Sequence, residues 1–123
     1  MRKLFLSLAA GALIAASGSS MSSPATSADG ALVGPNGMTL YTFDRDAAGS
    51  GKSLCNGACA TLWPPLLASD TDQAAGDYAV IARDDGKKQW AYKGKPLYYF
   101  SRDTKTGDKT GDGFNQVWKT ARP

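Results

Sequence analysis

One ten-residue segment occurs twice in this chain, with a constant separation of 57 residues. Residues 37–46 have the sequence GMTLYTFDRD, and residues 94–103 have the sequence GKPLYYFSRD. Gly, Leu, Tyr, Phe, Arg and Asp recur in the same order, which indicates two copies of one structural unit. Neither copy is large enough to bury its aromatic side chains alone, so we expect the two halves to pack against each other.

The N-terminal segment has the pattern of an export signal. Arg2 and Lys3 precede an apolar run, Leu4–Ala16, which is too short to span a bilayer comfortably, and small residues follow it. The next tract, Ser17–Ala28, is rich in Ser and Ala and is expected to be a flexible leader. Signal cleavage is expected at small residues near the start or near the end of this tract, and both sites stay open.

Residues 29–123 are therefore predicted to form a single domain, after a signal peptide and leader at residues 1–28. Removing Arg2 and Lys3 leaves 12 of the 14 basic residues against 11 acidic residues. This balance argues against nucleic-acid binding, which needs a concentrated basic face. All acidic residues are Asp, and the chain has no His. Asp and Gly favour turns, so the composition predicts strands joined by tight loops.

Apolar runs between turn signals predict a small, mainly β domain of antiparallel strands in two pseudo-symmetric repeats, at about residues 31–67 and 77–122. The expected strands are residues 31–33 and 38–43 in the first repeat and residues 78–83, 88–92, 96–101 and 116–122 in the second. Tyr41 and Phe43 share one face of their strand, which we expect to be buried. Trp118 is expected to correspond to Trp63 of the first copy.

The only two cysteines lie between the repeats, in the segment Leu54–Leu67 with the sequence LCNGACATLWPPLL. One helical turn brings residues four apart within disulfide reach, and the two prolines end such a turn. Behind an export signal, Cys55 and Cys59 are expected to form a disulfide that holds a loop or short helix between the repeats. Zinc needs further Cys or His ligands, and covalent haem needs a His where Ala60 stands, so no cofactor is predicted.

Three motifs occur together in this chain. The pattern Y-x-[FWY]-x-x-D occurs twice, C-x-x-x-C-A-x-x-W-P-P lies between the copies, and D-G-x-x-Q-x-x-Y-x-G-x-P-L-Y lies in the second copy. From about Ala31 to Pro123 the chain thus resembles a bacterial secreted-repeat family, known as predicted lipoproteins with a Yx(FWY)xxD motif. The resemblance implies a small exported domain and assigns no activity. Many members carry a cysteine at the signal cleavage site, but no Cys precedes Cys55 here, so a periplasmic or secreted form without a lipid anchor is expected.

The repeated motif also supplies the candidate binding residues. Its Tyr and Phe bury large areas, and its Asp can accept hydrogen bonds from the loop that follows the strand. A structural hinge used twice is the favoured interpretation. The alternative is a pseudo-symmetric surface on which the arginines and tyrosine hydroxyls contact a ligand. The candidate residues are Tyr41, Phe43, Arg45, Asp46, Tyr98, Phe100, Arg102 and Asp103.

A second candidate site is a metal site in the loop Asp103–Gly113. Asp103, Asp108 and Asp112 lie among glycines, and calcium takes oxygen ligands from flexible loops of this kind. Two lysines interrupt the acidic residues, and the spacing differs from that of an EF-hand. A solvated turn is therefore the favoured interpretation of the loop.

The chain has little equipment for catalysis. Without His, Glu or a free thiol, the common catalytic triads are excluded. Asp44 with Asp46, or Asp84 with Asp85, could serve a small hydrolase, but near neighbours on a turn point apart. Residues 46–53, DAAGSGKS, approach a nucleotide-binding loop, but Asp46 replaces its first glycine and no helix follows.

We therefore expect an exported, non-enzymatic envelope protein that binds or scaffolds through its repeat surface. The expected partner is an envelope protein or a glycan, because exposed aromatic rings are common anchors of recognition. Neither nucleic acid nor a transmembrane anchor is expected. The alternatives are a cation-responsive module that uses the Asp103–Gly113 loop and a small hydrolase that uses Asp carboxylates.

Overall fold

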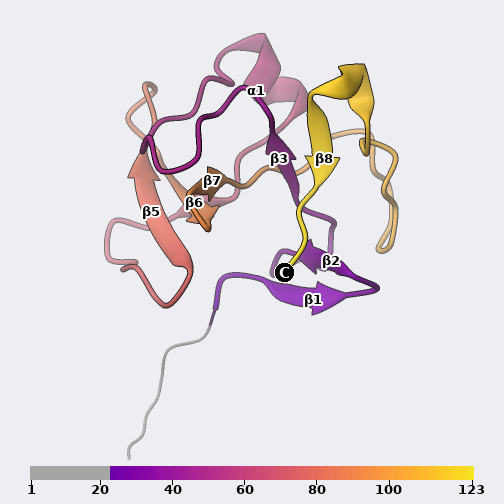
Figure 1. Ribbon diagram of the computed structural model, residues 1–123, viewed down its shortest axis with the longest axis horizontal. Helices are drawn as coiled ribbons and strands as arrows, with labels where there is room; N and C mark the ends of the chain where they lie inside the picture. Colours follow the sequence, from indigo (N-terminus) through magenta and orange to yellow (C-terminus); the bar gives the residue numbers. More distant parts are fainter. Residues whose placement is uncertain (1–22) are drawn as a thin grey trace, which may run out of the picture.

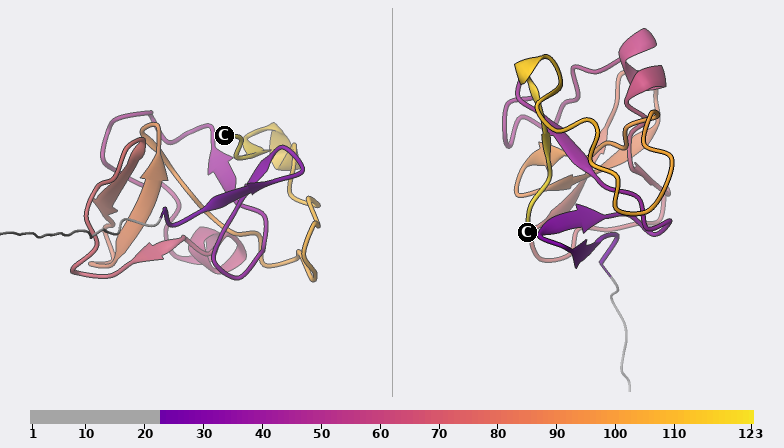
Figure 2. Two further views of the ribbon diagram at one scale, coloured as in Figure 1. Left: turned by 90° about the horizontal axis from the view of Figure 1, so that it is seen from below. Right: turned by 90° about the vertical axis from the view of Figure 1, so that its right-hand side faces the viewer.

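A computed structural model describes residues 23–123 of the chain (Figure 1). The predicted signal peptide falls mainly on residues 1–22, which lie outside the described residues. The β1–β2 hairpin occupies one end of the domain, whereas the helical turns α1 and η2 lie at the other end (Figure 2).

The described residues form a small antiparallel β structure with short strands, as the sequence predicts. Strand β1 pairs with β2, β3 pairs with β8, and β6 lies between β4 and β5 and also pairs with β7. In chain order the elements are β1 (Thr26–Ala28), β2 (Ala31–Val33), β3 (Tyr41–Phe43), α1 (Ala58–Leu62), β4 (Leu67–Ala68), β5 (Tyr78–Ala82), β6 (Lys88–Tyr92), β7 (Lys95–Pro96), the 3₁₀ turn η2 (Phe114–Gln116) and β8 (Trp118–Thr120).

The two halves are intertwined, because each motif strand pairs with the C-terminal segment of the other copy. Strand β3 of the first copy pairs with β8 of the second, with Phe43 opposite Trp118. In the other direction, Tyr98 of the second copy forms a bridge with Pro65 of the first. At the centre, the backbones of Tyr41 and Tyr98 exchange hydrogen bonds of 2.7 and 2.9 Å. Neither half therefore completes its hydrogen bonds without the other.

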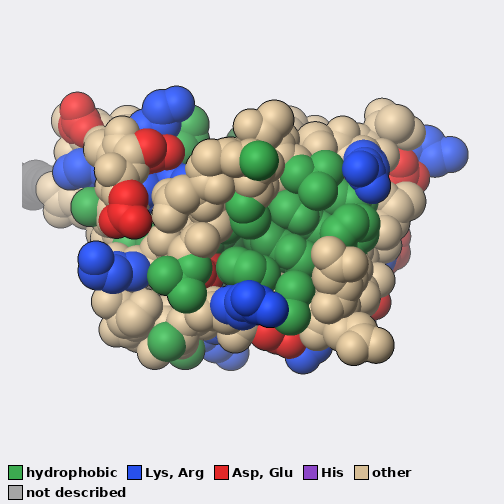
Figure 3. All heavy atoms as spheres, turned by 90° about the horizontal axis from the view of Figure 1, so that it is seen from above, with side chains coloured by type: hydrophobic (Ala, Val, Ile, Leu, Met, Phe, Trp, Pro, Cys, Tyr) green, Lys and Arg blue, Asp and Glu red, His purple; other side chains and the backbone are tan. Residues whose placement is uncertain are grey.

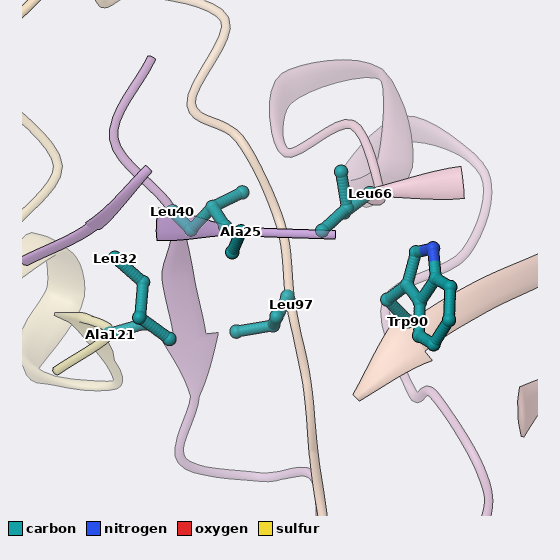
Figure 4. Close-up of a cluster of buried hydrophobic side chains, with 7 residues drawn as sticks. All are labelled: Ala25, Leu32, Leu40, Leu66, Trp90, Leu97 and Ala121. Carbon is teal, nitrogen blue, oxygen red and sulfur yellow. The ribbon is translucent and has the colours of Figure 1, made fainter. Parts of the chain in front are cut away.

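Equivalent residues of the two halves build one apolar cluster (Figure 4). Leu40 and Leu97 occupy the same position of the two motif copies and are both fully buried. The seven members of the cluster are Ala25, Leu32, Leu40, Leu66, Trp90, Leu97 and Ala121. The core thus spans the boundary between the repeats.

The end of the predicted leader belongs to the folded domain. The prediction of a flexible segment is therefore wrong for strand β1. Strand β1 pairs with β2 through Thr26 opposite Val33, and Ala25 is buried. Asp29 and Gly30 both have positive φ angles, 51° and 78°, and form the tight turn between the strands. An Asp-Gly dipeptide is a strong hairpin signal, and it is the signal that the sequence interpretation overlooked.

Other elements differ from their predicted ranges mainly in length. Helix α1 and strand β6 form where they are predicted. The expected strand at residues 96–101 is reduced to β7 and the isolated bridge of Tyr98. It is short because Tyr98 pairs with Tyr41 and Pro65 rather than continuing alongside β6.

Four aromatic rings from both copies form a continuous stack, which we call the aromatic stack, in the order Phe43, Trp118, Trp63 and Phe100. Successive ring centroids are 4.3, 3.8 and 4.1 Å apart, and the two indole planes differ by only 3°. Each phenylalanine lies on the tryptophan of the other copy. The predicted correspondence of Trp63 and Trp118 is therefore confirmed.

Gly111 lies against the edge of this stack. A Cβ atom at this position would lie 2.7 Å from Trp63 and 2.9 Å from Phe100. The φ angle of Gly111 is not positive, so close contact rather than backbone conformation requires a glycine here.

We predict that Gly111→Ala lowers the free energy of unfolding by about 1–3 kcal/mol, because the added methyl group overpacks the aromatic stack. Lys105→Ala, an exposed change in the same loop, should stay within about 0.5 kcal/mol of the parent. Urea unfolding followed by tryptophan fluorescence measures both effects. Equal stability of the parent and Gly111→Ala would contradict the packing described for the stack.

Candidate functional site

The predicted binding residues lie mostly inside the domain. Six of the eight are buried: Tyr41, Phe43, Asp46, Tyr98, Phe100 and Asp103. Only Arg45 and Arg102 are exposed. The repeated motif therefore forms the contact between the halves, and its two arginines are the part that solvent reaches.

The tyrosines and aspartates of the motif form two reciprocal pairs between the copies. The Tyr41 hydroxyl donates to Asp103 at 2.6 Å, and the Tyr98 hydroxyl donates to Asp46 at 2.5 Å. The other oxygen of each carboxylate accepts a hydrogen bond from the loop that follows its own motif. Asp46 accepts from the Leu54 amide at 2.7 Å, and Asp103 accepts from the Thr110 amide at 3.0 Å. Each aspartate thus connects its own loop to the tyrosine of the other half.

Burial perturbs the titration of these tyrosine–aspartate pairs. Desolvation raises the pKa of Asp46, and the hydrogen bond from Tyr98 opposes this change by stabilising the carboxylate. Desolvation, together with the hydrogen bond to the neighbouring Asp, raises the pKa of Tyr41 and of Tyr98 well above the ordinary tyrosine value. Both phenols therefore stay protonated at neutral pH and remain hydrogen-bond donors.

The side chains of the three candidate calcium ligands do not converge on one point. Asp103 is engaged with Tyr41 and Thr110, whereas Asp108 accepts from the Thr104 amide at 2.9 Å and Asp112 from the Thr120 amide at 2.9 Å. Within residues 23–123, no group of three Asp or Cys side chains is placed to hold a metal ion. The loop carboxylates instead order their own turns, as expected for short Asp side chains. These backbone hydrogen bonds also lower the pKa of Asp108 and of Asp112.

The carboxylate pairs considered for hydrolysis are each divided between different environments. In the first pair, Asp44 contacts Lys119 at 3.0 Å, whereas Asp46 accepts from Tyr98. In the second pair, Asp84 accepts from Asn56 at 3.4 Å, whereas Asp85 pairs with Arg83 at 3.1 Å. In both pairs, the two carboxylates contact different partners rather than one shared group.

The disulfide and a buried arginine fix the segment between the repeats. Cys55 and Cys59 are bonded to each other, as predicted. The guanidinium of Arg83 donates to the Cys55 carbonyl oxygen at 2.8 Å and to Gln89 at 2.8 Å, and it pairs with Asp85. Arg83 is only 4% exposed, yet sequence reasoning missed it because nothing distinguishes one arginine at the end of a strand.

A cleft of about 590 Å³ lies beside β8 and the turn between β6 and β7. We call it the cationic cleft, because its lining holds four basic residues and one acidic residue. Its lining residues are Thr42, Tyr92, Lys93, Lys95, Asp112, Gly113, Lys119, Thr120, Ala121 and Arg122. Sequence reasoning missed the cleft because its cations come from two distant segments and form no run in the sequence.

Three of the four cations contact protein oxygens, Arg122 only weakly through the Gly30 carbonyl oxygen at 3.5 Å. The Lys95 ammonium donates to the carbonyl oxygens of Phe43 and Asp46 at 3.1 and 3.0 Å. Lys119 pairs with Asp44 at 3.0 Å, but this pair is largely exposed and weak. Lys93 and Arg122 are exposed and extend the positive charge to the rim of the cleft.

The equivalent face of the other half has a different character. Motif residues correspond at an offset of 57 and the C-terminal segments at an offset of 55, so Thr42 is equivalent to Tyr99, Lys119 to Pro64 and Arg122 to Leu67. The Tyr99 hydroxyl would lie 2.2 Å from a Cβ atom at Gly34, so this ring covers the glycine closely. Leu67 is half exposed. At these three positions one half thus carries Tyr99, Pro64 and Leu67, where the cationic cleft has Thr42 and two cations.

Hydrophobic side chains also gather at the end that carries α1 and η2, with basic side chains at their border (Figure 3). Leu62, Phe114 and Val117 pack there on the aromatic stack and are partly exposed. The guanidinium of Arg102 lies 5.9 Å from the centre of the Phe114 ring. This contact places one of the two accessible motif arginines beside that ring.

We predict that Tyr98→Phe lowers the free energy of unfolding by about 1–3 kcal/mol, because one oxygen of the buried Asp46 carboxylate loses its hydrogen-bond donor. Tyr99→Phe is the matched control, since the Tyr99 hydroxyl makes no hydrogen bond to another residue within 23–123, and it should stay within about 0.5 kcal/mol. Urea denaturation compares the two variants with the parent. Equal losses in both would show that the pair between the halves contributes nothing specific.

We also predict that stability falls steeply above about pH 10, where tyrosines of the unfolded chain ionise. Because the native pKa values of Tyr41 and Tyr98 are raised, their stabilisation is complete below this pH and is lost above it. Each of the two tyrosines lowers the free energy of unfolding by up to about 1.4 kcal/mol per pH unit in this range. Urea unfolding at stepped alkaline pH, with tyrosinate absorbance, measures the loss. In the Tyr98→Phe variant, stability should fall less steeply with pH. Ionisation of both phenols near pH 10 in the intact fold would refute the prediction.

Comparison with known proteins gives the chain a family. Within the part of the chain that the structure describes, no helix is long and apolar enough to cross a membrane. No curated protein and no solved structure matches the chain. A family described as a secreted repeat of unknown function matches twice, at residues 23–67 and 79–122. The first match includes the β1–β2 hairpin, and each match ends just after a segment that pairs with the other half. The chain therefore belongs to this family of secreted repeats and is an exported protein built from two copies of the repeat.

Proposed function

We propose that this protein is a non-enzymatic binding module and that its ligand is an anionic molecule that occupies the cationic cleft. The observation that carries the proposal is the difference between the two equivalent faces. The duplicated backbone would accept apolar side chains at both, as it does around Tyr99 and Leu67, yet one face presents basic residues. A shared fold does not require this difference, so we attribute it to ligand binding.

The cleft is suited to anions of modest size. Four cations and one carboxylate surround it, and the carboxylate of Asp112 is already engaged by the Thr120 amide. Opposing walls with the same sign of charge concentrate the field inside a cleft. Lys95, anchored on two carbonyl oxygens, gives the cleft a fixed charge, whereas Lys93 and Arg122 can adjust to the ligand.

A non-enzymatic role is supported by how the reactive groups are used. The chain has no His, and its two cysteines are joined to each other. The buried Asp46 and Asp103 carboxylates are hydrogen-bonded to the tyrosines of the opposite halves. These groups therefore hold the fold together, and binding is the activity that fits the cleft.

We predict that inorganic polyphosphate, used as a flexible anionic probe, binds in the cationic cleft. An NMR titration of the purified protein should shift the amide signals of Thr42, Lys95 and Lys119. Removing two of the cations with Lys93→Ser and Arg122→Ser should weaken binding by about tenfold, since each ionic contact contributes about 0.5–1 kcal/mol. Added salt should weaken binding to the parent, because these cations are only partly desolvated.

The matched control removes two exposed lysines that do not line the cleft, with Lys52→Ser and Lys87→Ser. This variant has the same net charge as the test variant and should bind within about twofold of the parent, because distant surface charges are screened. Equal weakening in both variants would mean that only net charge matters. That result, or the lack of any shift at the cleft residues, would overturn the proposed site.

A further inference from the structure

We infer that the ligand of the cationic cleft is a linear acidic glycan, in which a sugar that carries an acidic group is joined to neutral sugars. This inference rests on the proposed function and adds the chemical class of the ligand. Three observations carry it: a second cavity that shares Tyr92 with the cleft, a pair of partly exposed tyrosine rings, and the different charge of the two cavities.

Tyr92 lines both cavities. It is at the end of β6 and lines both the cationic cleft and a cavity of about 530 Å³. The second cavity is lined by residues that include Thr26, Ser27, Ala75, Asp77, Tyr78 and Pro123. A chain-like molecule that crosses the Tyr92 ring would therefore occupy both cavities, whereas a compact anion would fill only the first.

The rings at this crossing suit a sugar. Tyr78 and Tyr92 lie with their centroids 4.9 Å apart and their planes tilted by 44°, and both rings are partly exposed. A pyranose ring has an apolar face of C–H groups and a polar edge, so it can pack on an aromatic face while its hydroxyls remain hydrogen-bonded. The Lys93 ammonium lies 5.3 Å from the centre of the Tyr92 ring, so an acidic group on the same sugar would meet a cation there.

The two cavities differ in charge, and this difference defines the order of the sugars. All four basic side chains belong to the cationic cleft, while among the described residues Asp77 has the one charged side chain that lines the second cavity. Thr26, Ser27 and Tyr78 supply hydroxyl groups in the second cavity. A uniformly charged polyanion would place negative charge beside Asp77, which is unfavourable. A neutral sugar next to an acidic one avoids this cost.

The test compares a hyaluronan oligosaccharide, in which acidic and neutral sugars alternate, with three other probes on the purified protein. A chitin oligosaccharide has neutral sugars only, polyphosphate has charge without sugar rings, and poly-glutamate is an acidic peptide. We expect hyaluronan to bind more tightly than the chitin oligosaccharide and to shift the ring signals of both Tyr78 and Tyr92 in NMR spectra. Polyphosphate should leave the Tyr78 ring signals unchanged.

The key variant is Tyr92→Leu, which keeps an apolar side chain but removes the ring. It should weaken hyaluronan binding by about tenfold, the effect of losing about 1.4 kcal/mol of ring contact, and weaken polyphosphate binding clearly less, because polyphosphate has no sugar ring to pack on Tyr92. Tyr99→Leu, at a partly buried ring outside both cavities, is the matched control and should change neither affinity. Tyr92→Phe should keep hyaluronan binding, because the ring remains.

The outcomes separate this inference from the proposed function. If polyphosphate binds in the cleft but hyaluronan does not, or if Tyr92→Leu weakens both equally, the glycan inference is wrong and the anion site stands. If poly-glutamate depends on Tyr92 as strongly as hyaluronan does, the ligand is an acidic peptide and the inference is again wrong. If no anionic probe binds, both fail. If the Tyr92→Leu variant does not fold, the parent protein provides the test. The inference is then wrong if hyaluronan does not shift the ring signals of Tyr78 and Tyr92.

Discussion

The structure depends on two buried hydrogen bonds that each cross from one copy of the repeat to the other. Tyr41 donates to Asp103 and Tyr98 donates to Asp46, while their backbones pair at the centre of the domain. A buried carboxylate without a donor is costly, so each copy needs the tyrosine of the other. The motif therefore acts as an assembly element of a domain whose separate halves would leave charged groups and strand edges unsatisfied.

The aromatic stack follows from the same exchange. Because each motif strand pairs with the C-terminal segment of the other copy, Phe43 lies on Trp118 and Phe100 lies on Trp63. The two indoles then meet face to face at the centre. One sequence pattern thus supplies two polar pairs and two aromatic pairs that cross between the halves, and these side-chain contacts add to the pairing of the short strands.

The repeat, the disulfide and most elements could be predicted from the sequence because they depend on local patterns: a constant offset, a Cys spacing and alternating residues. What could not be predicted depends on which segments meet. Nothing in the sequence near Tyr98 indicates that its hydroxyl contacts Asp46 rather than a ligand, and nothing near Asp103 indicates that its carboxylate contacts Tyr41. Likewise, Lys95 and Arg122 share a cleft only through pairing between the copies. The β1 strand was predictable, since Asp29-Gly30 is a local signal.

The buried motif and the open cleft are physically connected. Thr42 lies between the buried Tyr41 and Phe43 and lines the cleft, and Lys95 is anchored on the carbonyl oxygens of Phe43 and Asp46. The tyrosine–aspartate pairs thus hold the floor of the cleft in place, while Lys93, Lys119 and Arg122 lie outside the motif. Substitutions at these outer positions can change the charge of the cleft without disturbing the contact between the halves. For this fold, the motif accordingly identifies the scaffold, and the surface character of each half is set by the residues that differ between the two copies.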